Sequence, residues 1–416
     1  MIKFGNENFK KEAISLWRQS FKDSNEYINY YFTSRYRHEN FLLYEDNNTL
    51  LGGCHFNPYT FTFFNNYFSS RYLVGVATFP QFKNSGVFKS IFNFSLDYFY
   101  KKGEDLIFLT AANPEVYSNF NFSFSHYLSN YFFNFDLINH FRVKHKTIEI
   151  TANNLSKYEA FISQEISCFS SFLNKEHNNF IDYLEETNLE NGHIYVVVDS
   201  KDQSIGAFTY LPTDDIISVQ HLFFNNCETL FSIFGFLNNF SDYYEKIEVT
   251  THYYCDLEAY LPNFKKIEKK VTPYLMSRIL NPKKFIECFL ENRFKSTNSS
   301  LSLNYNFILK ITDKDIKDNN FLIFCNYSNN SISYFYEDIF NKNNDECLKI
   351  IKNSYSEYEK CPLLTIDIKA LSQLIFGALS IDTLLKNNSI SIVNNYDINI
   401  LNYIFDIKKG YIHTDV

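Results

Sequence analysis

The chain has 416 residues, of which 45% are hydrophobic, so it is long enough for several domains and apolar enough to bury substantial cores. Its formal charge of −8 and the lack of a dense Lys/Arg block argue against a nucleic-acid partner and suit a cationic substrate instead. The 46 Phe and 32 Tyr, beside only 11 Gly, are typical of AT-biased codon usage, so the aromatic residues alone do not indicate stacking on nucleic-acid bases.

The sequence also argues against several other classes of protein. The first residues contain no apolar signal region and no apolar run is long enough to span a membrane, so we expect a cytoplasmic protein. The eight cysteines include no C-x-x-C pair, which indicates free thiols in a reducing compartment. The ten histidines show no ligand spacing such as H-E-x-x-H, so no metal is expected.

The first part of the chain alternates apolar strand-like runs with helical periodicity. In the first predicted helix, Ala13, Leu16 and Trp17 share one face. In chain order we predict a strand, two helices, a hairpin, a strand, a helix and a strand, over Ile2–Phe4, Phe9–Phe21, Tyr27–Arg35, Phe41–Tyr44 with Leu50–Phe56, Tyr72–Val76, Gly86–Lys101 and Leu106–Thr110.

The loop Gln81–Gly86, between a predicted strand and a predicted helix, is the most informative segment. Backbone N–H groups at the start of a helix lack intrahelical partners and point to where the macrodipole is positive, a geometry that captures a phosphate or pyrophosphate. Asn84 in this loop tolerates the left-handed conformation better than most residues. The alternative is an ordinary turn in which Ser85 caps the helix.

The same order of elements returns in the middle of the chain. A second hairpin is predicted over His193–Val198 and Ile205–Leu211, followed by a strand, a helix and a strand over Ile216–Phe224, part of Cys227–Phe240, and Lys246–Thr251. The segment Phe223–Asn226 replaces the phosphate loop and has neither a glycine nor a basic residue. We therefore predict that the second unit folds like the first and binds no coenzyme.

The last part of the chain has a different pattern, which predicts a separate α+β domain. Tyr274–Ile279 resembles a final strand that leaves through a linker marked by Pro282. Beyond it we predict helices over Lys284–Phe294, from Lys369 and near Ile398–Phe405, with strands near Leu301–Ile311, Phe321–Cys325 and Leu364–Asp367.

The loop Gln81–Gly86 resembles the Q/R-x-x-G-x-G/A loop with which GNAT acetyltransferases hold the pyrophosphate of acetyl-CoA, with Asn84 in place of the first glycine. The whole chain is similar to the Eis-like ("enhanced intracellular survival") family. The stretches that carry this resemblance are Gly75–Pro80, Leu109–Ala111 with Val116–Phe122, and Leu364–Asp367 with Leu371–Gly377.

The resemblance implies an α+β fold with tandem GNAT folds, whose mixed and mostly antiparallel sheets are flanked by helices, and an SCP2-like α+β domain. The implied domains are an active GNAT domain at 1–145, a degenerate GNAT domain at 146–285 and a sterol-carrier-protein-like domain at 286–416. A homo-oligomer is expected.

The resemblance also implies a set of acetyl-CoA contacts. The strand end would polarise the thioester carbonyl, the loop would hold the pyrophosphate, and a third contact would lie after the next strand. The residues at these positions are Val76, Ala77, Thr78, Gln81, Lys83, Asn84, Ser85, Gly86, Val87, Phe88, Lys89, Tyr117 and Ser118.

The proton donor of the family is a tyrosine, and this chain has Phe122 at that position. Tyr117, with Asn121 and Phe122, matches the Y-x-x-x-G-F pattern of GNAT enzymes, in which the tyrosine protonates the CoA sulfur. The alternative is that Tyr117 packs a helix against the sheet.

The family's general base is the C-terminal carboxylate, which corresponds to Val416. A free α-carboxyl group has a pKa of about 3.3–3.7, so it is ionised at neutral pH. Asp415 corresponds to a residue that binds a second amine, and the alternative for both is a frayed tail. The expected function is acetyl-CoA-dependent N-acetylation of a primary amine on a small substrate, polycationic aminoglycoside-like amines included. The alternative is a CoA- or lipid-binding protein whose catalytic site has decayed.

Overall fold

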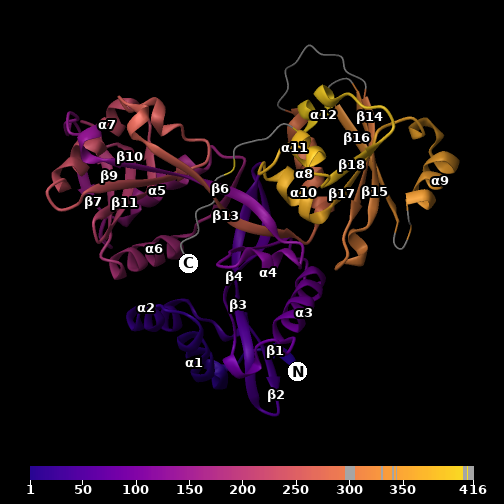
Figure 1. Cartoon of the computed structure of the whole chain (residues 1–416), viewed down its shortest axis with the longest axis horizontal. Coiled ribbons are helices and arrows are strands. Elements are labelled where there is room, and N and C mark those ends of the chain that lie inside the picture. Colours follow the sequence, from indigo (N-terminus) through magenta and orange to yellow (C-terminus); the bar gives the residue numbers. More distant parts are fainter. Residues whose placement is uncertain (296–304, 329–330, 340–341, 343, 406–409, 411–416) are drawn as a thin grey trace. The chain divides into compact units, whose positions relative to one another are not determined.

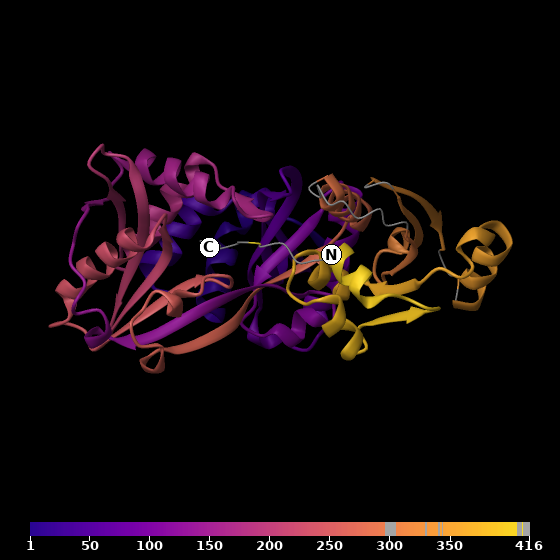
Figure 2. The same ribbon diagram turned by 90° about the horizontal axis from the view of Figure 1, so that it is seen from above.

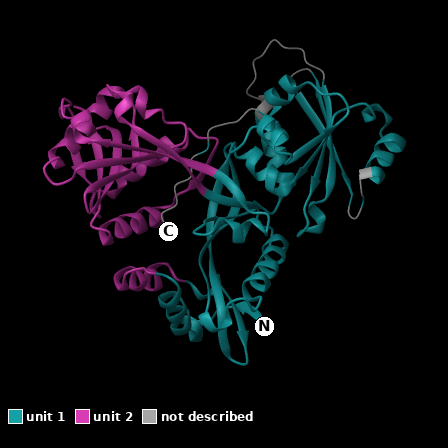
Figure 3. Cartoon of the chain, viewed as in Figure 1, with its two compact units in different colours: residues 1–21, 37–125, 275–410 teal, residues 22–36, 126–274, 411–416 magenta. Residues whose placement is uncertain are grey.

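The computed structural model of the protein describes residues 1–295, 305–328, 331–339, 342, 344–405 and 410. The chain divides into two compact units (Figure 3). Unit 1 contains residues 1–21, 37–125 and 275–410, and the described part of unit 2 contains residues 22–36 and 126–274. In the described ranges, no helix has both the length and the apolar composition that crossing a membrane would require.

The first sheet of unit 1 has the strand order β1-β2-β3-β4-β5-β13. Its strands are β1 (Ile2–Phe4), β2 (Phe41–Asp46), β3 (Thr49–Phe63), β4 (Asn66–Thr78), β5 (Leu106–Thr110) and the last residues of β13 (Glu268–Ile279). β4 and β5 are parallel, and the other neighbouring pairs are antiparallel. The predicted mixed α+β fold is therefore confirmed.

Helix α3 (Val87–Lys101) covers one face of this sheet (Figure 1). Its buried residues recur at helical spacing and pack against Leu42, Phe56 and Ile107 of the strands. Helix α1 (Lys10–Ser20) buries the predicted face of Ala13, Leu16 and Trp17. A short helix, α4 (Pro114–Ser118), follows β5.

Unit 2 has the strand order β6-β12-β11-β10-β9-β7, with β11 parallel to β12. Its strands are β6 (Ser123–Asn134), β7 (Lys146–Glu149), β9 (His193–Val198), β10 (Ser204–Thr213), β11 (Ile216–Phe224) and β12 (Lys246–His252), and β8 (Ser171–Asn174) lies off this path. With α7 (Cys227–Leu237) between the last two strands, the order β10–β11–α7–β12 repeats β3–β4–α3–β5 of unit 1, which confirms the predicted repeat.

Helices cover both faces of the unit 2 sheet, and successive side chains along its strands point into two different cores. Val197 faces the core that contains α7 (Cys227–Leu237), while Val196 and Val198 face the core under α5 (Leu155–Ile166) and α6 (His177–Leu189). Helix α2 (Asn25–Tyr30) also belongs to unit 2. Its C-terminal extension carries Arg35, which pairs with Asp182 of α6 at 3.1 Å and with Glu186 at 3.2 Å.

The C-terminal region of unit 1 forms a second sheet of order β16-β15-β14-β17-β18. Helix α9 (Asn344–Ser354) lies on one side of this sheet, and the other helices of the region lie on the opposite side (Figures 1 and 2). The strands are β14 (Tyr305–Thr312), β15 (Phe321–Ser328), β16 (Ser331–Asp338), β17 (Leu363–Asp367) and β18 (Ile390–Val393), and those helices are α8 (Pro282–Lys295), α10 (Ile368–Ile375), α11 (Ile381–Lys386) and α12 (Ile398–Ile404).

Two details of this region differ from the sequence prediction. Pro282 is the first residue of α8 and not part of a linker, because proline suits the first helical position, where its missing N–H would have no partner. Strand β14 begins at Tyr305, and the preceding residues of the predicted strand, 301–304, lie outside the described ranges.

The C-terminal region packs on the hairpin end of β3 and β4 within unit 1. Phe285 of α8 stacks on Phe68 at 4.2 Å, and Phe376 meets Phe63 edge-on at 5.8 Å. Burial of these rings joins the region to the first sheet through apolar contact, which explains why both belong to one unit.

Candidate active site

The parallel pairing of β4 and β5 ends before the strands do. It covers three pairs, from Ser70 with Leu106 to Tyr72 with Phe108. Beyond them β4 continues to Thr78, and β5 continues to Thr110 while pairing with β13 on its other edge. Beyond these three pairs the facing edges of β4 and β5 are not paired with each other, so their backbone groups along this opening have no ladder partner on the neighbouring strand. At its start the Tyr72 hydroxyl lies 3.0 Å from Thr110 Oγ1.

A β-bulge lies in β4 at the same level. His55 of β3 is opposite Val74 and Gly53 is opposite Ala77, so Cys54 alone faces the two residues Gly75 and Val76. A bulge leaves its extra residue out of the ladder and twists the strand. Of the predicted contacts, Val76 lies in the bulge and Ala77 and Thr78 follow it, with Val76 and Thr78 half-buried. Backbone N–H groups here suit the oxygen of a thioester carbonyl.

The predicted phosphate loop has the backbone expected of an anion site. Asn84 has φ = +63° and Gly86 has φ = +82°, so Asn84 adopts the left-handed conformation that otherwise favours glycine. Gln81, Lys83, Asn84, Ser85 and Gly86 are exposed. A Cβ on Gly86 would meet no atom within 4 Å, so the loop faces open space.

Helix α3 begins without a side-chain cap. Gly86 is its N-cap residue, and the Ser85 hydroxyl instead donates to the carbonyl oxygen of Phe82 at 2.5 Å. The alternative of a turn capped by Ser85 is therefore wrong. The first N–H groups of α3, on Val87, Phe88 and Lys89, remain available to an anion. Neither Lys83 nor Lys89 forms an ion pair within the described ranges, and both are exposed.

Tyr117 lies on α4 among aromatic rings. Its ring centroid lies 5.9 Å from that of Phe88, 5.7 Å from Phe92 and 6.2 Å from Phe122. Burial, followed by the proximity of Cys54 and Tyr72, raises the pKa of the Tyr117 hydroxyl to about 12. Tyr117 is therefore close to the bulge and to the opening, and it stays protonated at neutral pH.

The neighbours of Tyr117 define its chemistry further. No hydrogen bond joins its hydroxyl to a residue that the structure describes. Ser118 is half-buried and accepts a hydrogen bond from Lys369 Nζ at 2.6 Å. Phe122 is fully buried and has no proton to donate. Tyr117 thus brings a protonated hydroxyl close to the opening, with no hydrogen bond to the described residues.

The remaining predicted site residues, Asp415 and Val416, lie outside the described ranges. All the others lie in unit 1, on the end of β4, the following loop, the start of α3, and α4. Sequence patterns did not identify Cys54 and Tyr72 beside Tyr117, or Lys369 beside Ser118, because each pair is brought together by packing between elements distant in sequence.

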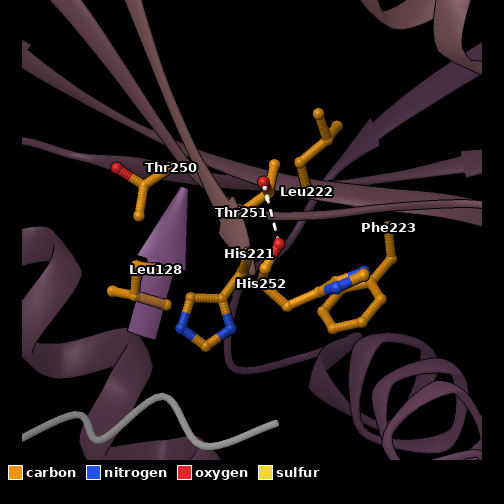
Figure 4. Close-up of a pocket in the computed structure, with 7 residues that line it drawn as sticks. All are labelled: Leu128, His221, Leu222, Phe223, Thr250, Thr251 and His252. Carbon is orange, nitrogen blue, oxygen red and sulfur yellow. Dashed lines mark hydrogen bonds between the residues drawn. The ribbon is translucent and has the colours of Figure 1, made fainter. Parts of the chain in front are cut away.

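Unit 2 repeats the opening and the bulge. The β11–β12 pairing ends at Val219 with Val249, and two residues of β11, His221 and Leu222, face Phe208 of β10 alone. His221 has φ = +48°, the left-handed counterpart of Gly75. Here side chains fill the space, and the hollow beside His221 and His252 (Figure 4) has no room for a water molecule, whereas typical ligand pockets measure roughly 300–1,000 Å³.

The helix of unit 2 that corresponds to α3 is also closed to an anion. Asn226 caps α7, with its side-chain oxygen accepting from the Thr229 N–H at 2.9 Å. The Thr229 hydroxyl donates to Asn225 at 2.9 Å. Side chains of the protein thus occupy the position that is open at Gly86, which supports the prediction of a single coenzyme site.

The sequence model of the acetyltransferase (GNAT) domain family matches residues 2–125. This range contains the bulge, the phosphate loop and α4. Residues 2–125 therefore match a GNAT acetyltransferase domain, and the protein is an enzyme; enzymes with this domain use an acyl-CoA. A search of curated proteins finds no match.

Solved structures similar to the chain cover nearly all of it. A conserved protein of Enterococcus faecalis V583, described as a probable N-acyltransferase, has a TM-score of 0.78 at 14% identity over 100% of this chain and 99% of its own. A GCN5-related N-acetyltransferase of Anabaena variabilis ATCC 29413 has a TM-score of 0.76 at 14% identity, over 99% and 97%. Eis1 of Mycobacterium abscessus has a TM-score of 0.71 at 13% identity, over 100% of both chains. At such identities the likeness establishes the fold.

Proposed function

We propose that the protein transfers an acetyl group from acetyl-CoA to a primary amine of a small substrate by direct attack on the thioester. One observation carries the proposal. The opening between β4 and β5, with the bulge at Gly75, is followed by an uncapped helix start at Gly86 and lies close to the protonated hydroxyl of Tyr117.

Each part of acetyl-CoA has a counterpart in this arrangement. The pyrophosphate would bind the N–H groups from Asn84 to Lys89, with the side chains of Gln81, Lys83 and Ser85 around it. The thioester would lie along the strand end, where N–H groups of Val76, Ala77 and Thr78 hold the developing oxyanion. Ser118 would contact the coenzyme from α4.

In the proposed reaction one group donates a proton to the leaving thiolate and another accepts the proton of the attacking amine. The amine nitrogen attacks the thioester carbon to give a tetrahedral oxyanion, whose collapse breaks the carbon–sulfur bond. The Tyr117 hydroxyl gives its proton to the departing thiolate. The proton of the attacking amine goes to a base, proposed to be the α-carboxylate of Val416. Asp415 would bind a second ammonium group of the substrate.

The net charge of −8 supports a cationic acceptor, and polycationic amines of the aminoglycoside kind are proposed as its class. We also propose the domain limits 1–145, 146–285 and 286–416, with a sterol-carrier-like function for the last domain and a homo-oligomeric assembly. The five-stranded sheet with helices on both faces supports an independent role for the C-terminal domain.

The alternative is a CoA- or lipid-binding protein without catalysis. It is favoured by Phe122, which is fully buried where the family has its proton donor. The left-handed Asn84 argues against decay of the phosphate loop, because this residue has kept the backbone conformation that a glycine would provide.

The test is to incubate the purified full-length protein with acetyl-CoA and a panel of primary amines while following free-thiol release. Amine-dependent release, with the acetylated amine found by mass spectrometry, supports the enzyme. Saturable acetyl-CoA binding without turnover on any amine would favour the binding protein instead.

A further inference from the structure

The C-terminal region of unit 1 contacts the segment that follows Tyr117. Lys369 Nζ donates to Ser118 Oγ at 2.6 Å, and the Ser123 hydroxyl donates to the carbonyl oxygen of Lys369 at 2.9 Å. Lys314 Nζ donates to the carbonyl oxygen of Asn119 at 2.8 Å. The Asn121 side-chain amide donates to Asp315 at 2.8 Å. Four of the six residues 118–123 are thus hydrogen-bonded to residues more than 190 positions later.

The partners of this segment are firmly held. Asp313 accepts two hydrogen bonds from Arg278, both at 2.8 Å, and both side chains are fully buried. The Asp315 N–H donates back to Asp313 at 3.0 Å. Lys369 lies in the first turn of α10, which Asp367 caps by accepting from the Ala370 N–H at 2.7 Å. These bonds hold Asp315 and the first turn of α10, which carries Lys369, in place from within the C-terminal region.

The segment itself has little structure of its own. Helix α4 has five residues, too few to be stable without tertiary contacts. The turn after it is closed on Tyr117, whose carbonyl oxygen accepts from the N–H groups of Phe120 at 2.9 Å and Phe122 at 3.3 Å. A shift of Ser118 would therefore also move the Tyr117 ring.

Of the four contacts, the one from Lys369 reaches the residue next to Tyr117. Its side chain is half-buried, and its ammonium group forms no ion pair with a carboxylate in the described ranges. Among the described residues, that ammonium group donates to the hydroxyl of Ser118, the residue next to Tyr117. Because no carboxylate among the described residues pairs with Lys369, we take the hydrogen bond to Ser118 on α4 as the main role of its side chain.

We propose that Lys369, from the C-terminal region, is a positioning residue for acyl transfer: by holding Ser118 it sets the Tyr117 hydroxyl toward the sulfur of the bound acyl-CoA. This inference rests on the proposed function, in which Tyr117 is the proton donor. It makes the C-terminal region part of the active-site architecture, in addition to any ligand of its own.

The experiment compares full-length variants in the thiol-release assay. Lys369→Met should lower kcat about tenfold, because a small misplacement of a reacting group costs this much or more. Lys369→Arg should keep kcat within about threefold of wild type, because it can still donate to Ser118. Lys386→Met, which removes an exposed i,i+4 pair with Asp382 in the same region, should leave kcat unchanged.

The decisive measurement is a double-mutant cycle. If Lys369 acts through Tyr117, Lys369→Met should have no further effect on kcat in a Tyr117→Phe background. Multiplicative losses, or a wild-type kcat in the Lys369→Met single variant, would overturn the inference. If Lys369→Met does not fold, Ser118→Ala removes the same hydrogen bond, and its kcat, measured at saturating acetyl-CoA so that the proposed coenzyme contact of Ser118 does not enter, should show the same non-additivity. A wild-type protein that binds acyl-CoA without any turnover would instead contradict the proposed function, so the two failures are distinguishable.

Discussion

Trp17, the single tryptophan of the chain, lies against the backbone of Gly75 in the bulge of β4. A Cβ atom on Gly75 would come within 2.5 Å of the indole Cζ3 atom, and Gly75 has φ = +64°. The indole also stacks on His55 of β3 at 5.8 Å. Helix α1 thus packs on the bulge through a contact that only glycine permits, which links the core of unit 1 to the shape of the candidate active site.

The first prediction concerns this contact. Gly75→Ala should lower the free energy of unfolding by about 2–4 kcal/mol, because it combines a left-handed backbone with overpacking against Trp17. Gly103→Ala is the matched control, since Gly103 has φ = +78° but open space around its Cβ position. It should lose only about 1–2 kcal/mol from backbone strain. Urea unfolding followed by Trp17 fluorescence measures both, and equal losses would contradict the role assigned to the indole.

The second prediction is that each chain binds one acyl-CoA, at the N-terminus of α3. Gly86→Glu should abolish binding, because a carboxylate at the uncapped helix start competes with the pyrophosphate. Asn226→Asp is the control in unit 2, where the side chain caps α7, and it should leave binding intact. Titration calorimetry gives the stoichiometry and the affinity. Two equivalent sites in the wild type, or unchanged affinity in Gly86→Glu, would contradict the assignment.

The third prediction concerns the proton donor. Tyr117→Phe should lower kcat by roughly 10²–10⁴-fold with little change in acyl-CoA affinity, because it removes a positioned acid. The raised pKa of about 12 keeps Tyr117 protonated, so its ionisation should not reduce kcat at any pH up to about 10. Steady-state kinetics across pH, together with calorimetry, check both statements. A kcat within a few-fold of wild type would leave Tyr117 a packing residue.

The fourth prediction concerns the chain terminus. If the α-carboxylate of Val416 is the general base, amidation of the C-terminus should depress kcat strongly while hardly changing shape. Asp415→Asn should mainly raise KM for polycationic amines, because it removes a binding charge and leaves the base. An N-terminal tag is the control and should have no effect. Unchanged kcat/KM in the amidated protein would exclude Val416 as the base.

The fifth prediction is a loss of stability in acid. Burial lowers the pKa of both His55, in unit 1, and His126, in unit 2, to about 3. The unfolded chain has histidine pKa values near 6.5, so it binds protons that the folded chain does not bind between about pH 6.5 and pH 3. Keeping the two histidines neutral therefore costs the folded chain no stability above pH 6.5, and the free energy of unfolding decreases as the pH falls from 6.5 toward 3.

Thermal unfolding across this pH range measures the effect. His126→Gln should make the unfolding temperature of the protein less dependent on pH between 6.5 and 3, because it removes one group that must be kept neutral. His140→Gln, at an exposed position, should leave the pH dependence as in wild type. A pH dependence that is the same in both variants would contradict the assignment to His126.

Much of the fold follows from local sequence. The strands Ile2–Phe4, Leu106–Thr110, His193–Val198 and Ile216–Phe224 have the predicted bounds, because each is a short apolar run between turn-forming residues. Helix α3 begins at Val87, one residue after the predicted start at Gly86, and Asn84 adopts the left-handed conformation that the sequence predicts it to tolerate, since backbone preferences act within a few residues. The loop proposed to bind the phosphates could for this reason be singled out from the sequence.

The remaining architecture depends on contacts between distant segments. The pairing of strand edges decides where β4 separates from β5. The bulge at Gly75 depends on packing against Trp17, and Phe41 of β2 packs against His55 of β3 beside it. These contacts have no local sequence signature. Tyr117 could be nominated from a pattern, but its position beside Cys54 and Tyr72 required the tertiary structure. The contact between Lys369 and Ser118 joins residues 251 positions apart. Local sequence thus determined the elements and the backbone of the loop before α3, while long-range packing decided where β4 separates from β5 and which residues surround Tyr117.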